Sequence, residues 1–233
     1  MSVLDFGPAE FEALWLSLKI ALTASILSII PAIAVAHALS RSGWMGRAFL
    51  NVIVNAPLVL PAVVIGYLLL VVFGVRGPIG QWLNDVLGIR LVFTTAGAVL
   101  AVAVMSFPLM VRAIRLSMDT IDPGLEFAAR TLGASRLDVF LTISLPLMLP
   151  GILAGFIIAY AASLGEFGAT ITFAANVVGE TRTLPLAIYT AIQTPDGDLL
   201  AMRLVILSSV LAVIALALSE FIEQQARRVV YGR

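Results

Sequence analysis

Residues 139–165 read VFLTISLPLMLPGILAGFIIAYAASLG and contain no Asp, Glu, Lys or Arg. An α-helix rises about 1.5 Å per residue, so about 20 apolar residues cross the hydrocarbon core of a bilayer, which is roughly 30 Å thick. A stretch of this length and composition therefore predicts a transmembrane helix. The rest of the chain decides whether this helix is a lone anchor or one of several.

The whole chain has the composition of a membrane protein. Of its 233 residues, 61% are hydrophobic and 12% are charged, whereas an ordinary soluble domain has about 25% charged residues. Mean hydropathy is +1.06 and the formal net charge is zero. These values exclude a basic nucleic-acid-binding protein, an acidic disordered tail and a water-soluble globule with a normal surface.

The apolar stretches predict an all-α polytopic membrane protein with about five transmembrane helices in one domain, 1–233. The predicted spans are residues 14–39, 48–73, 91–111, 139–165 and 199–222. Between the last two lie two further uncharged stretches, 167–179 and 183–195. As helices, each of these would reach only about 20 Å, which is too short to cross the bilayer. We therefore expect a re-entrant or interfacial segment there.

The sequence lacks the residues for several kinds of chemistry. It has no cysteine and a single histidine, His37, so we expect no disulfide, thiolate zinc site or multi-histidine metal site. Its one lysine, Lys19, does not lie in a G-x-x-x-x-G-K-[ST] phosphate loop, so the chain does not hydrolyse ATP by that route. The centres of the spans carry no ionisable residue, which argues against a proton relay. We expect the energy source to lie outside this chain.

The distribution of arginines predicts the orientation of the spans. Cytoplasmic loops carry an excess of Lys and Arg. Alternate loops collect most of the arginines, and the N-terminus falls on the opposite side from them. We therefore expect the N-terminus outside and the C-terminus in the cytoplasm. The arginines on the expected cytoplasmic side are Arg41, Arg47, Arg112, Arg115, Arg130, Arg136, Arg227, Arg228 and Arg233.

The expected cytoplasmic loop between residues 111 and 139 predicts a short amphipathic helix over about 122–133. Asp122 suits the N-cap and Pro123 the first helical position. Glu126 and Arg130 have the i,i+4 spacing of an ion pair. Gly133 suits the left-handed conformation that ends a helix. The apolar face of this helix would consist of Leu125, Ala128, Ala129 and Leu132.

Two roles fit this short helix. It can rest on the lipid surface, or it can fit a groove on a soluble partner. Helices that lie on lipid usually carry Trp, Phe and Lys, and this face is small instead. After it, Ser135-x-x-Asp138 has the pattern of a capping box, which predicts the start of the next span.

The same loop resembles a family signature. Ala128-Ala129-x3-Gly133-x9-Ile143-x-Leu145-Pro146 is similar to the E-A-A-x3-G-x9-I-x-L-P signature of ABC-importer permeases. The Glu position of that signature aligns with Phe127, and the acid stands one residue earlier, at Glu126. In the family this segment is the coupling helix, which docks into the ATPase subunit. The resemblance therefore assigns ATPase coupling to Glu126, Phe127, Ala128, Ala129, Arg130, Leu132 and Gly133.

Two further segments resemble the permeases for oxyanions. Residues 163–173, SLGEFGATITF, are similar to a segment of molybdate, tungstate and sulfate permeases, and residues 179–195, GETRTLPLAIYTAIQTP, are closer to molybdate permeases. The resemblance implies a type I ABC importer permease fold in the bacterial inner membrane. It also implies a homodimer, a pair of ATPase subunits that bind ATP and Mg, a periplasmic oxyanion-binding protein, and alternating access. No metal or cofactor is expected on this chain.

The mid-membrane stretches lack positive charge, which suits a path without a tight binding site. Residues that we expect along the path or at its gate are Asn51, Asn55, Ser163, Gly165, Glu166, Gly168, Thr170 and Thr172. Two alternatives remain open from the sequence. One is a permease for sulfate or another small solute. The other is a membrane scaffold that binds an ATPase without moving solute.

Overall fold

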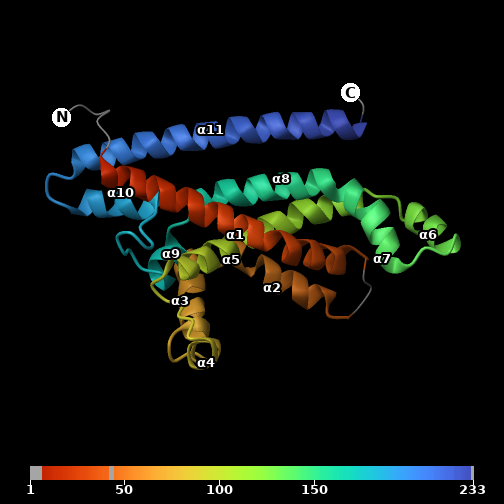
Figure 1. Cartoon of the computed structure of the whole chain (residues 1–233), viewed down its shortest axis with the longest axis horizontal. Helices are drawn as coiled ribbons and strands as arrows, with labels where there is room; N and C mark the ends of the chain where they lie inside the picture. Colours follow the sequence, from red (N-terminus) through yellow and green to blue (C-terminus); the bar gives the residue numbers. More distant parts are fainter. Residues whose placement is uncertain (1–6, 42–44, 232–233) are drawn as a thin grey trace.

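Every regular element is helical in the computed structural model, which describes residues 7–41 and 45–231. The bundle is elongated, and its long helices run roughly along its long axis (Figure 1). The elements, in chain order, are α1 (Pro8–Arg41), α2 (Arg47–Val59), α3 (Ala62–Phe73), α4 (Pro78–Leu87), α5 (Thr95–Asp119), α6 (Pro123–Thr131), α7 (Arg136–Val139), the π-helix η1 (Phe140–Ser144), α8 (Leu145–Leu164), α9 (Gly168–Phe173), α10 (Leu184–Gln193) and α11 (Asp198–Tyr231).

Four helical segments are long and apolar enough to cross a membrane, or five if the bent pair α2 and α3 counts as one. Helix α5 packs against both α1 and α8, and α11 packs against α8 and α10. The main core lies where α5 meets α1 and α8, around Met110, Ile114 and Met148, all fully buried. The contact with α8 is close because Gly155 has no side chain there: a Cβ on it would lie 3.0 Å from the Met110 carbonyl oxygen.

The predicted span 48–73 is not one straight helix. It consists of α2 and α3, whose axes differ by 120°, and α3 and α4 leave the direction of the bundle (Figure 1). The break falls at Leu60 and Pro61. Leu60 is extended, with φ −76° and ψ 144°, because the ring of a following proline disfavours the helical conformation. Pro61 thus divides the predicted span into two helices that meet at a bend.

The predicted span 91–111 differs from α5 at both ends. Helix α5 begins at Thr95, after Thr94, whose hydroxyl accepts a hydrogen bond from the Gly97 amide, and it ends at Asp119. Arg112 and Arg115 are therefore helical residues of α5 and do not lie in the following loop. The prediction ended the span at the first charge, whereas the helix continues through the charged residues.

The segment between α8 and α11 holds two short helices. Helix α9 has 6 residues and α10 has 10, so neither reaches across a core of roughly 30 Å. Helix α10 is held against α1, because the Leu184 amide donates a hydrogen bond of 2.7 Å to the buried Ser17 hydroxyl. The turn before α10 is also ordered, since Arg182 donates a 2.9 Å hydrogen bond to the side-chain oxygen of Asn176.

Candidate functional site

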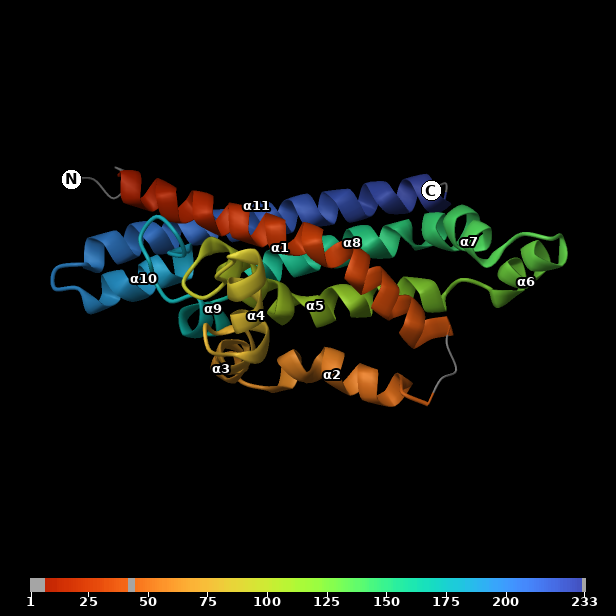
Figure 2. The same cartoon turned by 60° about the horizontal axis from the view of Figure 1, so that its bottom comes forward.

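Helix α6 projects beyond the ends of the long helices, at the same end of the molecule as the last turns of α11 (Figures 1 and 2). Its local signals act as the sequence predicts. The Asp122 carboxylate accepts a 2.8 Å hydrogen bond from the Gly124 amide. Gly133 has φ +91°, and the amide of Ala134 returns to the carbonyl of Ala129 at 3.1 Å. These contacts confirm both predicted helix ends.

No residue of α6 is buried. The exposed fractions of Leu125, Phe127 and Leu132 are 49%, 63% and 89%. Ala128 is exposed and Ala129 half-buried. Large side chains that stay uncovered on a short, capped helix are typical of a surface that meets a partner.

Glu126 does not form the predicted ion pair with Arg130. Its carboxylate instead lies 3.3 Å from Nε of Arg41, at the end of α1. It also accepts a 2.9 Å hydrogen bond from the hydroxyl of Ser144 in η1. Arg41 further donates to the carbonyl oxygens of Met118 and Ile121, at 3.3 and 3.1 Å. Glu126 thus fastens α6 to α1 and η1.

Glu126 and Phe127 both line the cavity beside Arg41, but the Glu126 carboxylate contacts the Arg41 guanidinium, whereas the Phe127 side chain is 63% exposed. Sequence reasoning missed Arg41 and Ser144 as partners because they lie far from Glu126 along the chain. The signal in the sequence for this contact was Arg41 itself, a charged residue at the end of the predicted span 14–39.

Arg130 lines a cavity of about 540 Å³ between α1, α6 and α7. His37, Arg41 and Arg136 line the same cavity. The His37 ring contacts the edge of Phe140, with 5.6 Å between ring centroids. The base of α6 is therefore rich in cationic groups, with Glu126 as the acid among them.

Asn51 and Asn55, two of the expected path residues, line a second cavity, of about 370 Å³, between α2 and α5. Two arginines of α5, Arg112 and Arg115, line it with them. Arg115 donates to the Asn51 side-chain oxygen at 3.2 Å, and Arg112 donates to that of Asn55 at 3.4 Å. Sequence reasoning missed both arginines as site residues. Their spacing of three, and the spacing of four between the asparagines, would have placed each pair on one helix face.

The other expected gate residues lie in and after the last turn of α8 and do not line this cavity. The Ser163 hydroxyl is buried and donates to the Ala159 carbonyl of its own helix at 2.6 Å. Gly165 is the C-cap of α8. Glu166 accepts a 2.7 Å hydrogen bond from the Ala169 amide. Burial raises the pKa of the Glu166 carboxyl, and the backbone hydrogen bonds that it accepts act in the opposite direction.

Helix α9 carries the remaining three gate candidates and packs closely on α3. A Cβ on Gly168 would lie 2.7 Å from Cβ of Ala62. Thr170 is fully buried, and the Thr172 hydroxyl donates to the Gly168 carbonyl at 2.8 Å. A Cβ on Gly66 of α3 would lie 2.7 Å from that of Thr172. The eight candidates therefore form two groups, one between α2 and α5 and one that runs from the end of α8 through α9, which packs on α3.

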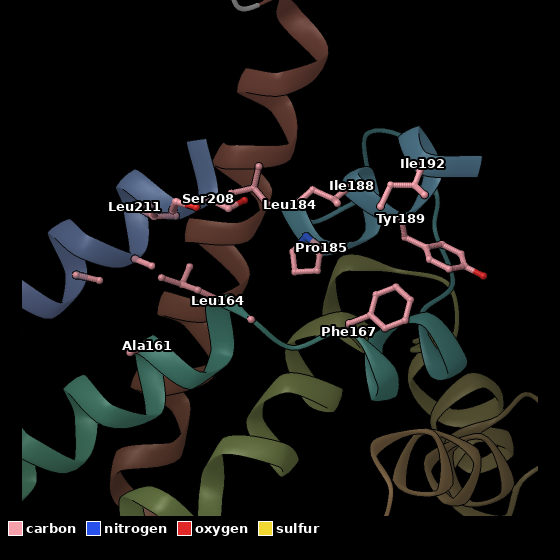
Figure 3. Close-up of a pocket in the computed structure, with 14 residues that line it drawn as sticks. Ala161, Leu164, Phe167, Leu184, Pro185, Ile188, Tyr189, Ile192, Ser208 and Leu211 are labelled. Atoms are coloured by element: carbon pink, nitrogen blue, oxygen red, sulfur yellow. The ribbon is translucent and has the colours of Figure 1, made fainter. Parts of the chain in front are cut away.

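A larger cavity, of about 730 Å³, lies among α8, α10 and α11 (Figure 3). Its lining is mostly aliphatic, and the rings of Phe167 and Tyr189 meet beside it, with 5.1 Å between centroids. Ser208 and Ser209 are the hydroxyl groups on the α11 side. A dianion needs strong donors in place of water, so this cavity suits an apolar occupant better.

These features define a class: a helical, multi-pass membrane protein with a short, capped and exposed helix, α6, at one end. The sequence model described as "Binding-protein-dependent transport system inner membrane component" matches residues 20–228. The chain belongs to this family of inner-membrane permeases.

Curated relatives and solved structures agree with this assignment. The chain is 55% identical over 218 residues to the molybdenum transport system permease protein ModB of Escherichia coli K12, covering 94% of this chain and 95% of the relative. It is 49% identical over 219 residues to ModB of Haemophilus influenzae, covering 94% and 96%. A solved bacterial ABC transporter involved in import of the acidic polysaccharide alginate shares the fold, with a TM-score of 0.75 at 17% identity, covering 95% of this chain and 81% of that one. The fold is that of a type I ABC importer permease, as the sequence predicted.

Proposed function

We propose that this chain is the transmembrane permease subunit of an ATP-driven importer that carries molybdate, or its close analogue tungstate, into the cytoplasm. One observation carries the proposal. The chain presents a capped, uncovered α6 on an ABC importer permease fold, and relatives that match nearly its whole length at 49% and 55% identity are named as molybdenum permeases.

The proposed partners are of three kinds. This chain forms a pair with a second copy of itself, and one subunit of a separate ATPase docks on α6 of each copy. A periplasmic oxyanion-binding protein delivers the cargo to the opposite face, and lipid surrounds the bundle. ATP and Mg²⁺ belong to the ATPase subunit, because this sequence contains no phosphate loop of its own. The exposed side chains of Leu125, Phe127 and Leu132 support docking at α6.

The proposed orientation places α6 and the C-terminal end of α11 in the cytoplasm and the start of α1 outside. Two observations support it. The start of α1 and the last turns of α11 lie at opposite ends of the long axis, and α6 lies at the same end as the last turns of α11 (Figure 1). Arg41, Arg130 and Arg136 gather around the cavity at the base of α6, as expected for a cytoplasmic face.

The proposed transport cycle is alternating access between two packings of the helices. ATP binding by the partner draws the two docked α6 helices together, and the bundle follows because Arg41 and Ser144 attach Glu126 to α1 and η1. We place the gate where α9 meets α3. The close approach of Gly66 to Thr172 supports a contact with little slack, and such contacts switch between discrete states.

The test is uptake of labelled molybdate at nanomolar supply by cells that carry the ATPase and binding protein, with and without this chain. We expect uptake only with the chain, blocked by excess tungstate and not by excess sulfate. If excess sulfate blocks uptake, the assigned cargo becomes sulfate in place of molybdate. Binding of the ATPase without uptake of any oxyanion would support a scaffold and contradict the proposal.

A further inference from the structure

The cavity between α2 and α5 combines positive charge with polar groups. Asn51, Asn55 and Arg115 are half-buried and Arg112 is exposed at the rim. Arg47 and Arg115 line an adjoining cavity of about 360 Å³ together with Asn51. In the part of the chain that the structure describes, the acid paired with this group is Asp119, whose Oδ2 lies 3.6 Å from Nε of Arg115.

The hydrogen bonds in this cavity occupy few of the N–H donors that Arg112 and Arg115 carry. A guanidinium carries five N–H donors in a planar fork that matches carboxylate and phosphate oxygens. Here Arg112 and Arg115 point one donor each at a neutral amide oxygen, of Asn55 and Asn51, at 3.4 and 3.2 Å. Charge-assisted hydrogen bonds to an anion are shorter and roughly twice as strong. An oxyanion would therefore displace the two amide oxygens. The NH₂ group of Asn55 lies in the same cavity and donates to the backbone and side-chain oxygens of Asn51, at 2.8 and 3.3 Å.

The size of the cavity also suits a small oxyanion. The volume of about 370 Å³ falls within the range of small-molecule sites and leaves room for a tetrahedral oxyanion with some of its water. The site lies toward the α6 end of α5, whose last residue is Asp119.

We propose that Arg112, Arg115, Asn51 and Asn55 form a weak binding site for the transported tetrahedral oxyanion, on the α6 side of the gate. This inference rests on the proposed function for the identity of its ligand. The site binds the dianion after it passes α9, and its partial exposure and the nearby Asp119 keep binding weak enough for release. It replaces the expectation of a path that has no anion site at all.

A phosphate headgroup of an anionic lipid has the same chemistry, so the experiment separates the two sources. The permease–ATPase complex is placed in nanodiscs of phosphatidylcholine alone, or with half phosphatidylglycerol, without nucleotide or binding protein. Binding of labelled molybdate is then measured by equilibrium dialysis. The variants are R112Q/R115Q and N55D. The control is R90Q, which changes the net charge by the same amount as N55D and alters an exposed side chain that donates a 2.9 Å hydrogen bond to Asn84 of α4. Co-elution with the ATPase on size exclusion verifies folding.

We expect saturable binding to wild type in both kinds of nanodisc. Affinity should fall by about tenfold or more in R112Q/R115Q and in N55D, and R90Q should match wild type. Equal affinity in wild type and both site variants would overturn the proposal. So would molybdate binding that phosphatidylglycerol abolishes, because the site would then belong to a lipid headgroup. The uptake assay for the proposed function is run in parallel. Normal uptake of molybdate with no effect of the variants on binding refutes the site alone.

Discussion

The contact between Glu126 and Arg41 should control how firmly α6 is held to the bundle. The perturbations are Glu126→Gln, Arg41→Gln and the double variant, with Glu12→Gln as a matched control on an exposed acid at the far end of α1. The two partners are 20% and 19% exposed, so water screens the pair only in part. The carboxylate also accepts a hydrogen bond from the Ser144 hydroxyl, and a hydrogen bond to a charged group contributes about 1.5–3 kcal/mol.

We expect the lower half of that range for Glu126→Gln. Arg41 keeps two carbonyl acceptors, Met118 and Ile121, when the carboxylate is lost, so its charge is not left without partners. A loss of about 1.5–2 kcal/mol lowers the ratio of α6 attached to the bundle to α6 detached from it by about 10- to 30-fold. Amides of α6 that exchange by local opening should then exchange faster by a similar factor.

The assay is hydrogen exchange of residues 123–131 in the purified permease–ATPase complex, together with ATPase activity stimulated by the loaded binding protein. Exchange in α6 should rise and stimulation should fall in each single variant, and Glu12→Gln should leave both unchanged. In the double variant the loss should be clearly less than the sum of the single losses. Losses that add to within about 0.3–0.5 kcal/mol would show that the two side chains act independently, which would refute this reasoning.

Three further changes test other parts of the structure. Gly133→Val should weaken co-purification of the ATPase, because a non-glycine residue near φ +91° costs about 1–2 kcal/mol. Gly133→Asn should retain co-purification. Normal co-purification of the valine variant would contradict the role of Gly133 in ending α6. Glu10→Ala should lower the thermal unfolding temperature of the complex, because the buried guanidinium of Arg203, 3.7 Å from the Glu10 carboxylate, loses this ion-pair partner. An unchanged temperature would count against the pair. Gly66→Ala should reduce molybdate uptake and stability together, since its Cβ would meet that of Thr172 at 2.7 Å and overpacking costs about 1–3 kcal/mol; wild-type uptake would argue against a tight gate there.

The features that the sequence predicted well depend on residues close together along the chain. Asp122 and Gly133 delimit α6 because a cap needs only backbone groups two to five residues away. The capping box of Ser135 and Asp138 also forms as predicted. The number of long apolar helices follows from composition alone, since the bilayer sets the length that a span needs.

The structure departs from a simple local pattern where a competing signal is present. The predicted span 48–73 forms a bent pair, α2 and α3, because Pro61 stops the first helix, and the described residues hold five candidate spans if this pair counts as one. The spacing of Glu126 and Arg130 suggested an i,i+4 pair, but such surface pairs contribute only about 0.2–0.5 kcal/mol. A better partner for Glu126, Arg41, was available from another helix.

The sequence by itself determined the membrane class, the positions of most helices, the caps of α6, and the family signature. The tertiary structure alone decided which side chains meet. It attached Glu126 to Arg41, placed Arg112 and Arg115 beside Asn55 and Asn51, and separated those asparagines from the candidate residues of α9. The physical reason is that helix formation and capping use contacts within a few residues, whereas burying side chains between helices depends on how distant segments pack.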